Sequence, residues 1–161
     1  PVALTPLQPN EATAVVMVGE HRGIGLHNLL WILRTFPNHF KNFIFVSVGI
    51  VDVESFSAKK ELTTMQENTN EMLDYFVNYC QQQGLAAKGF AAYGTDPTEK
   101  LTRLSKKIIK EFPHSLFFAS KLIFSKDNWI TRLLHNETAV MLQRRLHLLG
   151  VQLVILPMKI D

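Results

Sequence analysis

The segment from Gly19 to Gly25 has the composition of an anion-binding turn. It follows the short apolar run Ala14 to Val18, precedes a helical pattern and contains three glycines. Glycines let backbone N–H groups approach a ligand, and the amino end of a helix carries a partial positive charge. The segment is not a P-loop, because Gly-Lys-Ser/Thr is missing, and no third glycine follows Gly25 as a dinucleotide fingerprint requires. A second interpretation, in which the glycines serve only the geometry of a strand-to-helix turn, stays open.

Other chemistry-bearing residues form no recognisable catalytic or metal-binding set. The histidines have neither the His-x-x-x-His spacing nor the Cys/His clustering of metal sites, and they stand at His21, His27, His39, His114, His135 and His147. No Gly-x-Ser-x-Gly elbow is present for a nucleophilic serine. Glu20 and His21 lie on the glycine segment, where acid–base work could be done, but solvated surface charge is the simpler interpretation. We therefore expect no catalytic residue, no metal site and no cofactor.

Composition limits the remaining classes of protein. A chain of 161 residues with 47% hydrophobic and 19% charged residues is typical of one globular domain. The net charge of +3 is not gathered into a basic block, so we expect no nucleic-acid partner. The sequence contains no run of 18 apolar residues, so no segment is predicted to span a bilayer. Cys80 is the single cysteine, which suits a reducing compartment, and its place in a helical apolar pattern predicts an inert core thiol.

Apolar runs of strand length alternate with helical patterns along the chain. Strands are predicted at Ala14–Val18, Phe43–Val48, Leu85–Ala92, Ser115–Ala119 and Val151–Leu156, the third nearer an edge. Helices are predicted from the glycine segment to Phe36, over about Lys59–Gln83, from Pro97 to before Pro113, and over about Asn136–Leu149. Gly84 and Gly150 are predicted to end the second and fourth of them. Asp96 is the predicted N-cap of the third helix, with Glu99 at the capping-box position.

This alternation predicts one three-layer α/β domain. Strands that alternate with helices pair in parallel through right-handed crossovers, which gives a doubly wound, five-stranded parallel sheet. If the strand order is 3-2-1-4-5, ligands would bind where the order reverses, between the first and fourth strands. The predicted pocket residues are Gly19, Glu20, Gly23, Gly25, Ser120 and Lys121. Residues 1–12, rich in proline, are predicted to be a linker or an extended N-terminal segment, and residues 13–161 the domain.

Several groups of residues resemble known proteins. Gly94-Thr95-Asp96-Pro97 and the closing helix and strand resemble the universal stress protein family. Three segments are similar to the stress-protein-like cytosolic tail of bacterial permeases of the amino acid–polyamine–organocation superfamily: Gly23 to His27, Pro37 to Phe43, and Arg132 to Ala139. The resemblance implies a universal-stress-protein-like fold. It also implies a domain at the cytoplasmic face of the inner membrane, joined by a linker to the membrane-embedded part of the same polypeptide and soluble when isolated.

The chain departs from the pattern of the ATP-binding members of that family. They carry an acidic residue after the first strand, where Gly19 stands here with Glu20 following, and a glycine-rich stretch after the fourth strand. Residues 120–128 contain no glycine, and His135-Asn136-Glu137 replace the later Gly-Ser or Gly-Thr. We therefore expect a degenerate nucleotide pocket in a non-catalytic regulatory or oligomerisation domain of an amino acid or cation permease. A free-standing nucleotide-binding stress protein and an adenine-nucleotide hydrolase-type enzyme are the alternatives, and a small-molecule or nucleotide ligand stays open.

The predicted partner is a second copy of the chain. Two-fold homodimers are the commonest soluble assemblies, and the resemblance implies pairing through the last strand. Here Val151 to Ile160 is an apolar terminal strand, and a bare strand edge needs a partner or a cover. We therefore expect a homodimer whose interface includes Val151, Leu153 and Ile155.

Overall fold

The structure is a computed structural model that describes residues 3–19, 21–50, 58–120 and 138–156. The described chain contains a five-stranded sheet of order β3-β2-β1-β4-β5, and every neighbouring pair is parallel. The strands are β1 (Thr13–Met17), β2 (Asn42–Ile50), β3 (Ala86–Gly94), β4 (Ser115–Ser120) and β5 (Leu153–Leu156). The predicted fold class and strand order are confirmed, and β3 is an edge strand as expected.

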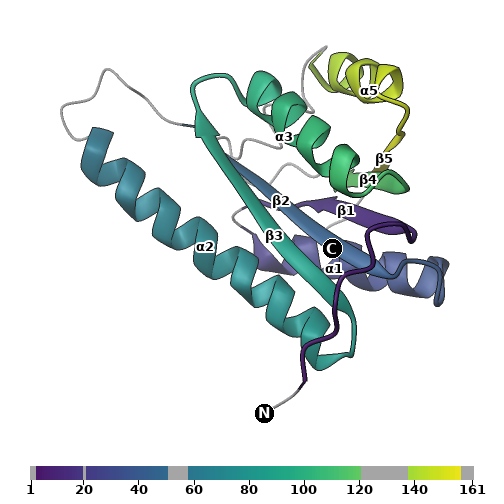
Figure 1. The fold of residues 1–161 in the computed structure, drawn as a ribbon. Coiled ribbons are helices and arrows are strands. Elements are labelled where there is room, and N and C mark those ends of the chain that lie inside the picture. Colours follow the sequence, from purple (N-terminus) through teal and green to yellow (C-terminus); the bar gives the residue numbers. More distant parts are fainter. Residues whose placement is uncertain (1–2, 20, 51–57, 121–137, 157–161) are drawn as a thin grey trace, which may run out of the picture.

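Helices cover both faces of the sheet (Figure 1). On one face lie α1 (Arg22–Thr35) and α2 (Ala58–Gln82), and on the other lie α3 (Pro97–Glu111) and α5 (Thr138–Leu148). Side chains of a strand alternate between the faces: Val16 packs with the α1–α2 core, whereas Val15 packs with the α3–α5 core. Because both faces are covered, the central strands read as continuous apolar runs rather than as alternating ones.

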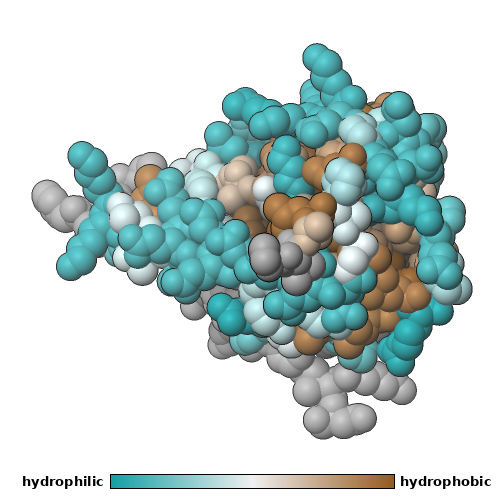
Figure 2. Space-filling view, turned by 60° about the horizontal axis from the view of Figure 1, so that its bottom comes forward, coloured by the Kyte–Doolittle hydropathy of each residue, from teal (hydrophilic) through white to brown (hydrophobic). Residues whose placement is uncertain are grey.

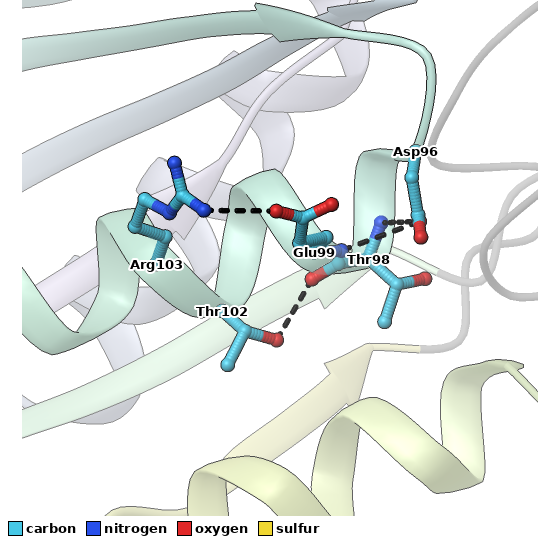
Figure 3. Close-up of polar contacts among 5 residues, drawn as sticks. All are labelled: Asp96, Thr98, Glu99, Thr102 and Arg103. Atoms are coloured by element: carbon cyan, nitrogen blue, oxygen red, sulfur yellow. Dashed lines mark hydrogen bonds and ion pairs between the residues drawn. The ribbon is translucent and has the colours of Figure 1, made fainter.

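The start of α3 follows from its sequence (Figure 3). Asp96 is the N-cap, and its Oδ1 accepts hydrogen bonds from the backbone N–H groups of Thr98 at 3.1 Å and Glu99 at 3.3 Å. Pro97 occupies the first helical position, which needs no N–H donor. Glu99 does not reach back in a reciprocal capping box; its carboxylate accepts a bond from Arg103 at 2.9 Å. The predicted cap is confirmed, and Glu99 has a different partner.

Two helices end on glycines in the left-handed conformation. Gly84 follows α2 with φ +74°, and Gly150 follows α5 with φ +90°. In each case the next residue donates a backbone bond to the last helical turn: Leu85 N–H to the Cys80 carbonyl at 2.8 Å, and Val151 N–H to the Leu146 carbonyl at 3.1 Å. This is the Schellman arrangement, and it explains why the sequence predicts both helix ends correctly.

The N-terminal segment lies against the domain across the amino ends of the strands. Gln8 and Asn42 exchange two hydrogen bonds, from Gln8 N–H to Asn42 Oδ1 at 2.8 Å and from Asn42 Nδ2 to the Gln8 carbonyl at 2.7 Å. Thr5 N–H donates to Gln81 Oε1 at 2.8 Å. The part of this segment that the structure describes is therefore docked on the sheet and on α2. Seen from the end where the N-terminus lies, apolar surface shows between polar side chains (Figure 2).

Two further observations concern the ends of the fold. Edge strand β5 is short, and α5 covers part of its open side, because Gln143 Nε2 donates to the Leu153 carbonyl at 3.2 Å. Within the described ranges, no helix combines the length and the apolar character needed to cross a membrane.

Candidate functional site

A cleft of about 860 Å³ opens at the carboxyl ends of β1 and β2, between β2 and the first half of α2. The amino-terminal half of α2 projects past the sheet (Figure 1). Residues from this part of α2 line one side of the cleft. The cleft is lined by Gly19, Arg22, Ser47, Val48, Gly49, Ile50, Lys60, Glu61, Thr64, Met65, Asn68, Thr69, Glu71 and Met72. Its volume lies in the range of small-molecule sites, and it occupies the end of a parallel sheet where such folds bind ligands.

Uncharged polar side chains face this space without protein partners. Ser47 is 4% exposed and Thr69 is 9% exposed, yet neither hydroxyl has a hydrogen bond in the part of the chain that the structure describes. Thr64 and Asn68 also line the cleft; both are exposed, and their side chains likewise have no hydrogen bond in the described chain. Deeply placed polar groups are normally satisfied by protein, water or ligand. These four side chains therefore offer hydrogen-bond donors and acceptors to whatever fills the cleft.

Charged groups stand at both ends of the cleft. At one end the Arg22 guanidinium lies 4.9 Å from the centroid of the Tyr75 ring, a cation–π contact that holds it beside α2. Glu71 precedes Tyr75 by one helical turn and lines the same space. Among the described residues, Arg22 and Glu71 form no ion pair with each other or with another residue. Lys60 and Glu61 line the opposite end, near the start of α2.

A glycine shapes the floor of the cleft. A Cβ atom at Gly49 would collide with Met65 Sδ and would lie 2.7 Å from Cδ1 of the Tyr93 ring. The missing side chain lets Met65 of α2 rest directly on β2. The hydroxyl of Tyr93 is buried on this side of the sheet without a hydrogen-bond partner in the described chain. Gly49 therefore sets the depth of the cleft beside α2.

Of the four predicted pocket residues that the structure describes, only Gly19 lines the cleft. Gly23 and Gly25 lie in the first turn of α1, not in a loop as predicted, because that helix already begins at Arg22. A Cβ at Gly25 would lie 2.5 Å from Cζ of Phe76, so this glycine allows α1 to pack closely on α2. Ser120 is buried at the end of β4, and its Oγ has no partner. Glu20 and Lys121 lie outside the described residues.

Sequence reasoning missed the wall that α2 contributes. Its cleft-lining residues recur at three- and four-residue steps, as Glu61, Thr64, Met65, Asn68 and Met72. The apolar members mark the buried side of the helix, as predicted. The signal that could have been used is the polar interruption of that side by Thr64 and Asn68, because polar residues on an inward stripe indicate a solvent-filled or ligand-filled space.

Two further findings concern metal-binding groups and the single thiol. No group of three or more His, Cys, Asp or Glu side chains within the described ranges could hold a metal ion. Burial raises the pKa of the Cys80 thiol to about 12, which keeps it protonated and unreactive at neutral pH.

Asn28 of α1 is 1% exposed, and both of its amide atoms lack a partner in the described chain.

The predicted interface residues do not share one environment. Val151 and Leu153 are buried in the core beneath α3 and α5, and Ile155 is half-buried against the same cluster. Their side chains are therefore engaged within the domain. The exposed large apolar side chains near β5 belong instead to α5 and its end: Val140, Met141 and Leu148.

Comparison with known proteins found no relative. No protein-family model matches the chain, and no curated protein matches its sequence. The stress-protein and permease resemblance therefore stays a prediction that rests on the segments quoted above.

Proposed function

We propose that this chain is a non-catalytic regulatory domain that binds a small molecule in the cleft between β2 and α2. The observation that carries the proposal is the set of unpartnered polar side chains around a cleft of about 860 Å³. Sites for small molecules combine such volumes with apolar walls and a few polar groups that fix the ligand's orientation. Here the side chains of Met65 and Met72 supply the apolar part, whereas those of Val48 and Ile50 pack with the α3–α5 core on the other face of the sheet.

We further propose that the regulated protein is a membrane permease that carries this domain on the same polypeptide. Support comes from the three segments that resemble the cytosolic tails of such permeases, two of which fall on positions that this fold constrains. Gly23 to His27 includes the packing glycine Gly25. Pro37 to Phe43 forms the turn after α1, where Asn38 takes a φ of +60° and Phe40 is buried.

A regulatory domain acts only if its ligand binds differently to two states of the transporter. A side chain that fills the cleft should therefore change the ligand response of transport without preventing membrane insertion. Asn68 lines the cleft and is exposed, so Asn68→Trp can fill the space without disturbing the core. Asn70 is exposed on the same helix but does not line the cleft, and Asn70→Trp is the matched control.

The test uses the intact polypeptide in proteoliposomes, with solute uptake measured for both variants. We expect Asn68→Trp to shift the half-saturating solute concentration or the maximal rate, and Asn70→Trp to behave like the parent. Equal uptake by all three proteins contradicts a regulatory role for the cleft. A reading frame that encodes no membrane helices joined to this domain contradicts the permease assignment.

The two alternatives make different predictions for the isolated chain. A nucleotide-binding stress protein should be stabilised by ATP, since a ligand stabilises the native state by RT ln(1 + [L]/Kd). A hydrolase should release AMP or phosphate from adenine nucleotides. We expect neither a melting shift with millimolar ATP nor turnover.

A further inference from the structure

The end of the cleft next to α1 presents opposite charges that are held apart. Arg22 is positioned over the Tyr75 ring at 4.9 Å, and Glu71 stands one turn before Tyr75 on α2. Residues four apart on a helix have Cβ atoms about 5–6 Å from each other, so Arg22 and Glu71 flank the same tyrosine. Both line the cleft, but no ion pair joins them in the described chain. The Arg22 guanidinium and the Glu71 carboxylate therefore both line the cleft without pairing with each other.

The amino end of α1 adds a second anion-attracting feature at this place. The N-cap side chain, His21, makes no capping bond to the helix, and no acidic residue stands in the first turn. Nothing lies within 4 Å of the position that a Cβ would take at Gly23, so this side of the first turn is open. The N–H groups at a helix start and the helix dipole favour a carboxylate or phosphate. Arg22, the first residue of α1, supports the same sign of charge.

Independent support for a ligand comes from the depth of the cleft. The hydroxyls of Ser47 and Thr69 belong to side chains that are more than nine-tenths buried, line the cleft and have no partner in the described residues. Next to them, Met65 and Met72 provide flexible apolar surface that adapts to different hydrocarbon shapes. The cleft thus combines a carboxylate-attracting end, a separate carboxylate of its own, buried hydroxyls and an apolar wall.

We propose that this cleft binds a zwitterionic α-amino acid, an inference that rests on the proposed function and names its ligand. The ligand's carboxylate lies at the amino end of α1 and Arg22, its ammonium group lies at Glu71, and its side chain lies toward Met65 and Met72. A ligand with only one charge leaves either Arg22 or Glu71 uncompensated, so both charges are needed for affinity. A nucleoside triphosphate would bring its negative charges toward Glu61 and Glu71.

The test compares three ligands of the same hydrocarbon shape on the 161-residue chain. L-Leucine carries both charges, 4-methylpentanoate lacks the ammonium group, and 3-methylbutylamine lacks the carboxylate. Binding is measured by calorimetry and ligand-observed NMR up to about 10 mM, which covers millimolar affinities. Leucine should bind at least about tenfold more tightly than either analogue, because each analogue lacks one of the two charge-assisted hydrogen bonds.

Two charge-neutralising variants assign the ends of the ligand. Glu71→Gln should weaken leucine about tenfold or more and leave 4-methylpentanoate unchanged, whereas Arg22→Gln should weaken leucine and leave 3-methylbutylamine unchanged. Both residues are exposed, so circular dichroism should show parent-like melting. The matched controls are Glu67→Gln on α2 and Arg34→Gln on α1, which are exposed and do not line the cleft.

Equal binding of the three ligands, or a loss that is the same for all of them in Glu71→Gln, overturns the inference. So does an absence of leucine binding, with or without binding of ATP. If leucine does not bind but Asn68→Trp still alters transport, the ligand class is wrong and the proposed function stands. If leucine binds as described but Asn68→Trp leaves transport unchanged, the regulatory function fails and the amino acid site stands.

Discussion

Gly25 and Gly49 owe their importance to contacts with residues far away in the chain. Gly25 belongs to a glycine segment that predicts an anion-binding turn, but it lies against Phe76 and holds α1 close to α2. Gly49 lies within β2, one residue beyond the predicted strand end at Val48, beneath Met65 and Tyr93. A local pattern shows that a glycine is present and does not show which distant side chain it accommodates. For this reason the packing role of Gly25 could not be predicted from the sequence.

Cys80 shows the opposite case, in which a single residue type and its helical position sufficed. The sequence predicts an inert core thiol, and the structure buries Cys80 fully and raises the pKa of its thiol to about 12, against an ordinary value of 9.0. Burial disfavours the thiolate, because it removes the charged form from water. The residue therefore needs no role beyond packing.

This burial makes the free energy of unfolding depend on pH in alkaline solution. The unfolded thiol ionises near pH 9, whereas the folded one stays protonated to about pH 12. The contribution of the protonated Cys80 thiol to the free energy of unfolding is fully present below pH 9. It is lost as the pH rises toward 12, at up to about 1.4 kcal/mol per pH unit. Urea unfolding at pH 8 to 10.5 should show this loss, and Cys80→Ala, although less stable overall, should show a shallower decline. Identical pH slopes for the two proteins would contradict it.

At the scale of helices and strands, the sequence predicts the type and order of the elements well, and it predicts their first and last residues less well. Hydrophobic period and terminal glycines or prolines place most elements, because those signals are local. The end of β3 was predicted at Ala92, but the strand continues to Gly94, which pairs with Ile50 of β2. Strand ends depend on the partner strand, and the partner's register is absent from a local pattern.

The cap of α3 provides a quantitative test at this scale. Asp96 satisfies two backbone N–H groups that have no partner within the helix, whereas Glu99 makes only a solvent-exposed pair with Arg103. Asp96→Ala should lower the free energy of unfolding by about 1 kcal/mol, within a range of about 0.5–2 kcal/mol. Glu99→Gln, the control, should cost less than about 0.5 kcal/mol, because an exposed ion pair contributes little. Chemical denaturation measures both, and equal costs would show that the cap bonds are unimportant.

At the scale of the whole molecule, the sequence predicts the sheet but not the cleft. The alternation of strands and helices predicts a parallel sheet, and the resemblance to the universal stress protein family implies the order 3-2-1-4-5, which the structure confirms. The general rule for such sheets places the pocket at the reversal between β1 and β4, whereas the cleft lies between β2 and α2. The position of the cleft depends on how far α2 projects past the sheet and on the close contact of Met65 with Gly49. Both are consequences of packing in three dimensions.

The outer surface of α5 leads to a prediction about assembly. Val140 is 58% exposed, Met141 is 47% exposed and Leu148 is 79% exposed, and the three follow one another around about a third of the helix. Exposed apolar side chains on one side of a helix can form an interaction surface, although the exposed Arg144 lies between these three. The neighbouring edge of β5 is short and partly covered by Gln143, so it is the less suitable contact. We therefore propose a two-fold dimer formed by α5 surfaces rather than by the side chains of Val151, Leu153 and Ile155.

Light scattering after size exclusion tests this assembly at micromolar to millimolar chain concentration. The mass of the parent should approach twice the monomer mass of 18.4 kDa as concentration rises. Leu148→Glu should remain near the monomer mass, because it places a charge in the apolar contact. Ile155→Pro is the discriminating variant. Gln152 accepts a bond from Phe117 of β4, so the backbone groups of alternate residues, including Ile155, face the open edge, where a proline would block strand pairing. Dimerisation that survives Leu148→Glu and disappears in a folded Ile155→Pro protein would assign the contact to the strand edge, because only edge pairing requires that backbone.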